Sequence, residues 1–142
     1  MAIRQLSVFL ENRKGRLQAI AQMLGDAGVN ISAISVADTA EFGILRLIVD
    51  DVTKAEQTLK ANGVVFHTND VIAIQIGSRP GSLASVLALL NETSINVEYM
   101  YTIAEPRHDA VLVLRFSDSA AAGESLLKGG VTLLNEAELG IR

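Results

Sequence analysis

The sequence predicts an α+β protein built from two copies of one small module. Three observations support this prediction. The segment Arg13-Lys14-Gly15-Arg16-Leu17 recurs 66 residues later as Arg79-Pro80-Gly81-Ser82-Leu83. Asn30 recurs at the same offset as Asn96. In both copies the apolar residues follow the period of a strand, then that of a helix, then that of a strand again. We therefore expect one module in residues 1–69 and a second in residues 70–142.

Each copy opens with a strand and an amphipathic helix. In residues 3–10, Leu6, Val8 and Leu10 alternate with other side chains, and the second copy of this strand falls at 71–76. Residues 15–27 are predicted to be a helix that Gly28 ends, whereas Ser94 predicts a different end for the second helix. We expect Leu17 to anchor the first turn of its helix in the core. The residues at helical spacing are Leu17, Ile20, Ala21 and Leu24 in one copy and Leu83, Val86, Leu87 and Leu90 in the other.

The second part of each copy contains two strands, a helix and a short final strand. Asp51 and Asp118 occupy the position of a helix N-cap. The helices that follow are expected to extend to Ala61 and Lys128, where glycines end them. Strands are predicted for 30–36, 44–50, 96–102 and 110–117 and from Val64 and Val131 onward, with turns at 38–42 and 105–109.

The resulting order in each module is β-α-β-β-α-β. This order gives a four-stranded antiparallel sheet with two helices on one face, the ferredoxin-like arrangement. The residues between the modules are few, so His67 to Asp70 are predicted to form the turn that joins them. So short a joint favours two modules packed side by side, with their sheets joined into one of eight strands.

Composition narrows the class of protein. Hydrophobic residues make up 49% of the 142 residues and charged residues 20%, which favours a packed core over disorder. The net charge of −4 argues against nucleic-acid binding, and no apolar run is long enough for a membrane span. Without cysteine there is no thiolate site, and His67 and His108 have no companions at ligand spacing, so no metal site and no cofactor are predicted. We expect a cytoplasmic protein without catalytic activity, since no catalytic motif is found.

The repeated strand-to-helix loop carries the most chemistry. Unpaired backbone N–H groups and the positive end of the helix dipole favour an anion such as a carboxylate there. Gly15 allows a ligand to approach the backbone, and Arg13 is placed to assist a carboxylate. A tight turn is the simpler interpretation of Gly15, but the second copy with Gly81 weakens it. For Arg13 and Arg79 a solvated loop charge is the favoured interpretation. Asn30 and Asn96 each offer one donor and one acceptor, with a turn role as the alternative.

These features resemble those of the ACT domain, a small regulatory module that binds amino acids. The resemblance rests on the element order, on Asn12-Arg13-Lys14-Gly15-Arg16-Leu17 and on Gly28-Val29-Asn30-Ile31, and it covers the chain as two tandem modules. It implies a free amino acid bound at the interface between the modules, with the loop of one module facing the strand-opening asparagine of the other. Ser78 replaces Asn12 in the second copy, which implies two unlike sites. The implied ligand-binding residues are Asn12, Arg13, Gly15, Arg16, Leu17, Asn30, Ile31, Ser78, Arg79, Gly81, Ser82, Leu83, Asn96 and Val97.

Two functions remain open on this basis. The leading one is a stand-alone amino-acid sensor, and the other is a regulatory subunit of an amino-acid biosynthetic enzyme such as acetolactate synthase. Tyr99 and Tyr101 are predicted to point away from the helices. If exposed, they would form a partner surface or a ligand-selecting wall, and a partly covered surface pair is the equal alternative. A homodimer with four modules would follow if that face is an interface. An RNA-binding module is disfavoured by the 4% of aromatic residues, and an enzyme by the lack of an acid-base group.

Overall fold

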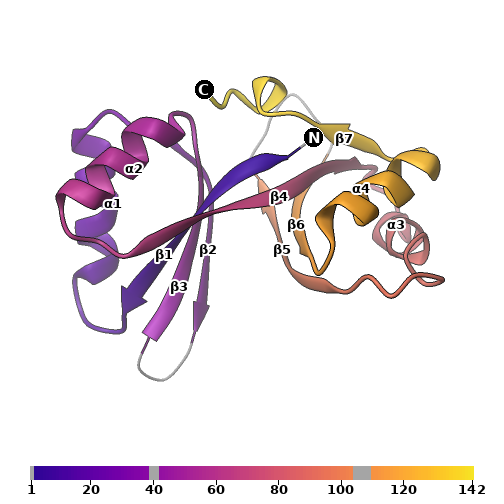
Figure 1. Cartoon of the computed structure of the whole chain (residues 1–142), viewed down its shortest axis with the longest axis horizontal. Helices are drawn as coiled ribbons and strands as arrows, with labels where there is room; N and C mark the ends of the chain where they lie inside the picture. Colours follow the sequence, from indigo (N-terminus) through magenta and orange to yellow (C-terminus); the bar gives the residue numbers. More distant parts are fainter. Residues whose placement is uncertain (1, 39–41, 104–109) are drawn as a thin grey trace. The chain divides into compact units, whose positions relative to one another are not determined.

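The structure is a computed structural model that describes residues 2–38, 42–103 and 110–142. The chain divides into two compact units (Figure 1). The first module comprises Arg4–Asn69 together with Gly140–Arg142, and the second comprises Asp70–Leu139 together with the residues before Arg4. Each module thus includes a few residues from the far end of the chain.

The first module has the predicted order of elements. Its sheet has the strand order β2-β3-β1-β4, and α1 and α2 cover one face of it (Figure 1). The elements are β1 (Ile3–Glu11), α1 (Arg16–Asp26), β2 (Ile31–Asp38), β3 (Phe42–Val49), α2 (Val52–Ala61) and the start of β4 (Phe66–Ile76).

The second module repeats this arrangement with the order β5-β6-β4-β7. Its elements are the remainder of β4, α3 (Ser82–Ala88), β5 (Val97–Ile103), β6 (Ala110–Phe116), α4 (Ser119–Lys128), β7 (Thr132–Leu134) and the short 3₁₀ helix η1 (Ala137–Leu139). The four-stranded antiparallel sheet with helices on one face is therefore confirmed in both modules.

The junction between the modules differs from the sequence prediction. His67 to Asp70 do not form a turn, because they lie inside β4, which runs without a break from Phe66 to Ile76. One strand therefore serves as the last strand of the first module and the first strand of the second. The described residues form seven strands where the sequence predicted eight.

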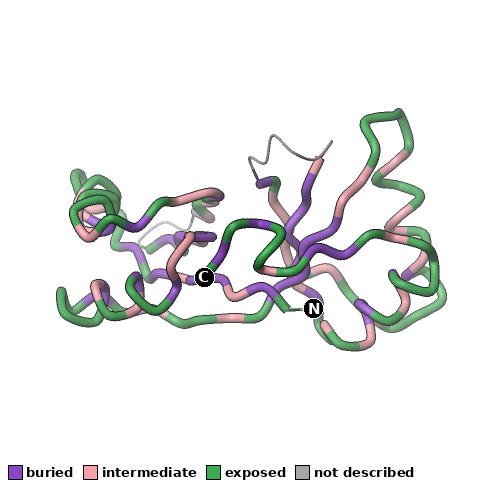
Figure 2. The backbone as a smooth tube through the Cα atoms, turned by 90° about the horizontal axis from the view of Figure 1, so that it is seen from above, coloured by how far each residue is buried: buried purple, intermediate pink, exposed green. Residues whose placement is uncertain are grey.

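The cores lie between each sheet and its helices. In the first module the register places Leu6 opposite Leu47 and Val8 opposite Leu45, and all four side chains are buried. Buried residues, purple in Figure 2, follow the strands and recur along α1, α2 and α4, whereas α3 has none. The second core is formed by Ile72, Ile74, Leu90, Leu112, Leu114, Phe116, Ala122, Leu126 and Leu133.

Two predictions about helix ends are confirmed. Gly28 adopts a positive φ of 77° after α1, which is the usual end of a helix at glycine. The corresponding helix α3 is shorter, with seven residues against eleven in α1. Turns follow it, held by the Thr93 hydroxyl, which accepts from the Ile95 N–H and donates to the Leu90 carbonyl. The predicted turns at 38–42 and 105–109 lie largely outside the described residues.

Candidate ligand-binding loops

The repeated glycine has the same conformation in both modules. Gly15 and Gly81 both have a φ of 85°, in the left-handed region, and each directly precedes a helix. A Cβ at either position would meet nothing within 4 Å. The left-handed backbone conformation therefore favours glycine at both positions, and crowding around the side chain does not. The space beside each loop is open.

The helices that follow these glycines have no side-chain cap, in contrast to the other two α-helices. The Asp51 carboxylate accepts from the Lys54 N–H at 3.1 Å at the start of α2, and Asp118 accepts from Ala121 N–H at 3.0 Å at the start of α4. The N-cap residue of α1 and of α3 is a glycine, which makes no side-chain cap bond. The N-cap residue of α1 therefore supplies no side-chain acceptor to the first-turn N–H groups, at the end of the helix where the dipole favours an anion.

A cavity lies beside each of the two loops. The first has a volume of about 220 Å³ and is lined by the loop and by the facing strands β2 and β3. The second has about 510 Å³ and is lined by the residues that follow β4 and by α3. The lining residues are Leu10, Glu11, Asn12, Arg13, Leu17, Val36, Ala37 and Gly43 in the first cavity and Ile76, Gly77, Ser78, Arg79, Gly81, Ser82, Leu83, Ala84 and Leu87 in the second.

The predicted core role of Leu17 is wrong. Leu17 is 40% exposed and Leu83 is 36% exposed, and both line the cavities. Ile20 and Leu24, one and two turns further along α1, are the residues that enter the core. The helical spacing was read correctly, but the first turn of α1 lies beside the cavity, outside the core.

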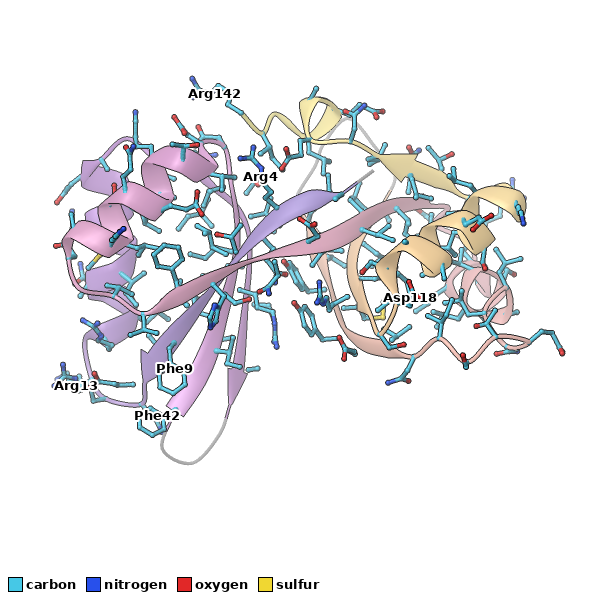
Figure 3. The ribbon with its side chains drawn as sticks, in the orientation of Figure 1. Arg4, Phe9, Arg13, Phe42, Asp118 and Arg142 are labelled. Carbon is cyan, nitrogen blue, oxygen red and sulfur yellow. The ribbon has the colours of Figure 1, made fainter. Side chains whose placement is uncertain are left out.

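The charged side chains of the first loop are partly paired. Arg13 Nε lies 3.2 Å from Glu11 Oε2, with both side chains largely exposed (Arg13 is labelled in Figure 3). Glu11 was not among the predicted ligand residues, although it lines the cavity. The buried Arg16 Nε has no hydrogen-bond partner in the described part of the chain. The loop thus carries the acidic Glu11 and the basic Arg13, Lys14 and Arg16 near the start of α1.

The two asparagines are fixed in the same way by their backbones. The Asn30 N–H donates to Asp50 Oδ1 at 2.9 Å, and its carbonyl accepts from the Asp50 N–H at 3.0 Å. In the second module Ser117 replaces Asp50, with distances of 2.9 and 3.0 Å to Asn96. Both asparagines are exposed and directly precede their strands, so Ile31 and Val97 begin β2 and β5. The pairing of each loop with the asparagine of the other module stays a prediction.

The tyrosines lie on the predicted face and are partly covered. Tyr99 pairs with Arg115 and Tyr101 with Val113, on the face opposite the core residues Leu112 and Leu114. Both tyrosines are half-buried, and Val113 is fully buried. Of the two predicted alternatives, the partly covered surface pair is therefore the one that the structure shows.

Comparison with known proteins identifies the family. A model of the ACT domain pair matches residues 1–141. The chain belongs to the ACT domain pair family. ACT domains are regulatory, ligand-binding modules without catalytic activity of their own. No functionally curated protein matches the sequence.

Solved structures of ACT pairs have the same fold. A protein from Bacteroides thetaiotaomicron is 39% identical, with a TM-score of 0.91 over 99% of this chain and 96% of that one. The regulatory subunits of aspartate kinase from Thermus thermophilus and Thermus flavus are both 15% identical, with TM-scores of 0.62 and 0.60. They cover 89% of this chain and 91% and 92% of their own. No helix among the described residues has the length and apolar character that crossing a bilayer requires.

Proposed function

We propose that this ACT domain pair is an amino-acid-binding regulatory protein. The observation that carries the proposal is the left-handed glycine at an uncapped helix start beside a cavity, present once in each module. Such a helix start binds a carboxylate through backbone N–H groups without competition from an aspartate cap. The Glu11 carboxylate at the first cavity is placed to receive an ammonium group.

Binding by itself does not regulate, so the bound state must differ from the free one in what it presents to a partner. A ligand that holds the loop, the helix start and a strand together favours one arrangement of these elements. A partner protein that prefers this arrangement then responds to the amino-acid concentration. The second function predicted from the sequence makes this partner a metabolic enzyme. The regulatory subunits of aspartate kinase, whose fold is similar, are an example of such a pairing. The homodimer and the cytoplasmic location stay predictions from the sequence.

Calorimetric titration of the purified chain with each of the twenty amino acids tests the proposal. We expect saturable binding of at least one of them at millimolar concentration or below. Replacing Asn12 with alanine is expected to weaken it by about tenfold, the effect of losing one hydrogen bond to a charged group. The proposal fails if none of the twenty binds.

The predicted contribution of both modules to one pocket is tested by a double-mutant cycle. Asn12→Ala and Asn96→Ala are made singly and together, and the binding free energy is measured for each. If the two asparagines hold the same ligand, their effects are coupled by about 0.5 kcal/mol or more. Additive effects would place them at separate sites.

A further inference from the structure

The first-module cavity has polar and apolar lining residues. The polar ones are Glu11, Asn12 and Arg13, which precede the glycine N-cap of α1. The apolar ones are Leu10, Leu17, Val36 and Ala37, together with Gly43. We propose that this cavity selects an α-amino acid with a short aliphatic side chain. This inference rests on the proposed function and adds the class of ligand.

The polar lining residues are complementary to the charged groups that all α-amino acids share. The ion pair between Arg13 and Glu11 brings one cation and one anion to the same wall of the cavity. A zwitterion presents the same two charges, so its carboxylate faces Arg13 and the α1 amides while its ammonium faces Glu11. Both side chains of the pair are largely exposed, so exchanging this weak ion pair for ligand contacts costs little.

Two of the apolar lining residues are exposed to water. Val36 is 49% exposed and Leu17 is 40% exposed, although both are aliphatic. Val36 lies opposite the buried Leu45 in the register, so it is on the helix-covered face of the edge strand β2. An aliphatic ligand side chain buries these surfaces and is stabilised by the hydrophobic effect, whereas a charged or amide side chain would lose hydration there without a partner.

The size of the cavity favours short side chains. A benzene ring alone occupies a cavity of about 150 Å³, so a cavity of about 220 Å³ leaves less room for an aromatic ring beside the charged end of an amino acid than for an aliphatic side chain. The second cavity is larger, with about 510 Å³.

The test uses two positions on one strand that differ in a single respect. Ile34 and Val36 share a face of β2 and are 52% and 49% exposed, but only Val36 lines the cavity. Binding of valine, leucine, aspartate, lysine and phenylalanine to the full chain is measured by calorimetry for wild type, Val36→Asp and Ile34→Asp. We expect valine or leucine to bind wild type at least about tenfold more tightly than the other three. Val36→Asp should weaken that binding by about tenfold or more, and Ile34→Asp by no more than about twofold.

A second pair of variants guards against a folding defect on the edge strand. Leu17→Ser removes an aliphatic side chain from the cavity lining, and Leu127→Ser changes an exposed leucine on α4 that does not line this cavity (53% exposed against 40% for Leu17). Only Leu17→Ser should weaken binding of the aliphatic amino acid. Preference for aspartate, lysine or phenylalanine, or equal losses within either pair of variants, would overturn the inference and leave the proposed function intact. Absence of binding by any amino acid would instead refute the proposed function itself.

Discussion

At the scale of single residues, a comparison of Gly15 with Gly25 distinguishes the effect of backbone conformation on stability from the effect of packing. Neither glycine has an atom within 4 Å of an added Cβ, but only Gly15 has a positive φ. We expect Gly15→Ala to lower the free energy of unfolding by about 1–2 kcal/mol, the cost of an L-residue in the left-handed region. Gly25→Ala, inside α1, should raise it by about 0.5–1 kcal/mol. Urea unfolding of both variants measures the difference, and a loss of stability for Gly25→Ala would contradict it.

The residues of the candidate loop could be predicted from sequence to different extents. The sequence indicated a tight turn at the glycine before each helix, because the repeat shows it twice, but the left-handed conformation comes from the structure. The exposure of Leu17 could not be predicted from the sequence, because helical spacing identifies a face of the helix but not where the sheet ends beneath that face. The role of Val36 as a cavity wall depends on its distance across the fold from the loop, which no local pattern encodes.

At the scale of elements, the two aspartate caps are a direct test of how α2 and α4 begin. Asp51 and Asp118 have nearly the same backbone angles and the same bond to the N–H three residues on. Replacement of either by alanine should cost about 1 kcal/mol of stability, and replacement by asparagine only a few tenths. Thermal and urea unfolding of the four variants checks this. Equal losses for alanine and asparagine at one cap would indicate that the charge matters more than the hydrogen bond.

The β4 junction shows why elements are predicted better than their connections. His67, Asn69 and Asp70 are typical turn residues, and the alternation of apolar residues stops there. They are nevertheless strand residues, and Asn69 accepts a hydrogen bond at 2.7 Å from the Ser7 hydroxyl on β1. A polar stretch of strand and a turn have the same composition, so only the pairing with β1 distinguishes them. The aspartate caps, by contrast, are decided within four residues and were predicted correctly.

At the scale of the whole molecule, the first module is completed by residues from the far end of the chain. Arg142 donates its N–H to the Asp50 carbonyl at 2.7 Å, its guanidinium lies 3.5 Å from the Asp50 carboxylate, and its main-chain oxygen accepts from Arg4 (Figure 3). The neighbouring Ile141 is buried, with 7% of its surface exposed. This segment therefore has two anchors, one charged and one apolar, and the same Asp50 carboxylate holds the backbone of Asn30.

The apolar anchor is expected to dominate. The Arg142 side chain is 74% exposed, so its ion pair with Asp50 is screened by water, and Arg142→Ala should cost no more than about 0.5 kcal/mol. Ile141→Ala removes a buried side chain and should cost about 2 kcal/mol. Urea unfolding at low and at 1 M salt separates the two, because only the ion pair weakens with salt. A larger cost for Arg142→Ala that disappears at high salt would instead make the ion pair the main anchor. In that case the Asp50 carboxylate, which accepts from the Asn30 N–H, would itself be held by a salt-sensitive ion pair with Arg142.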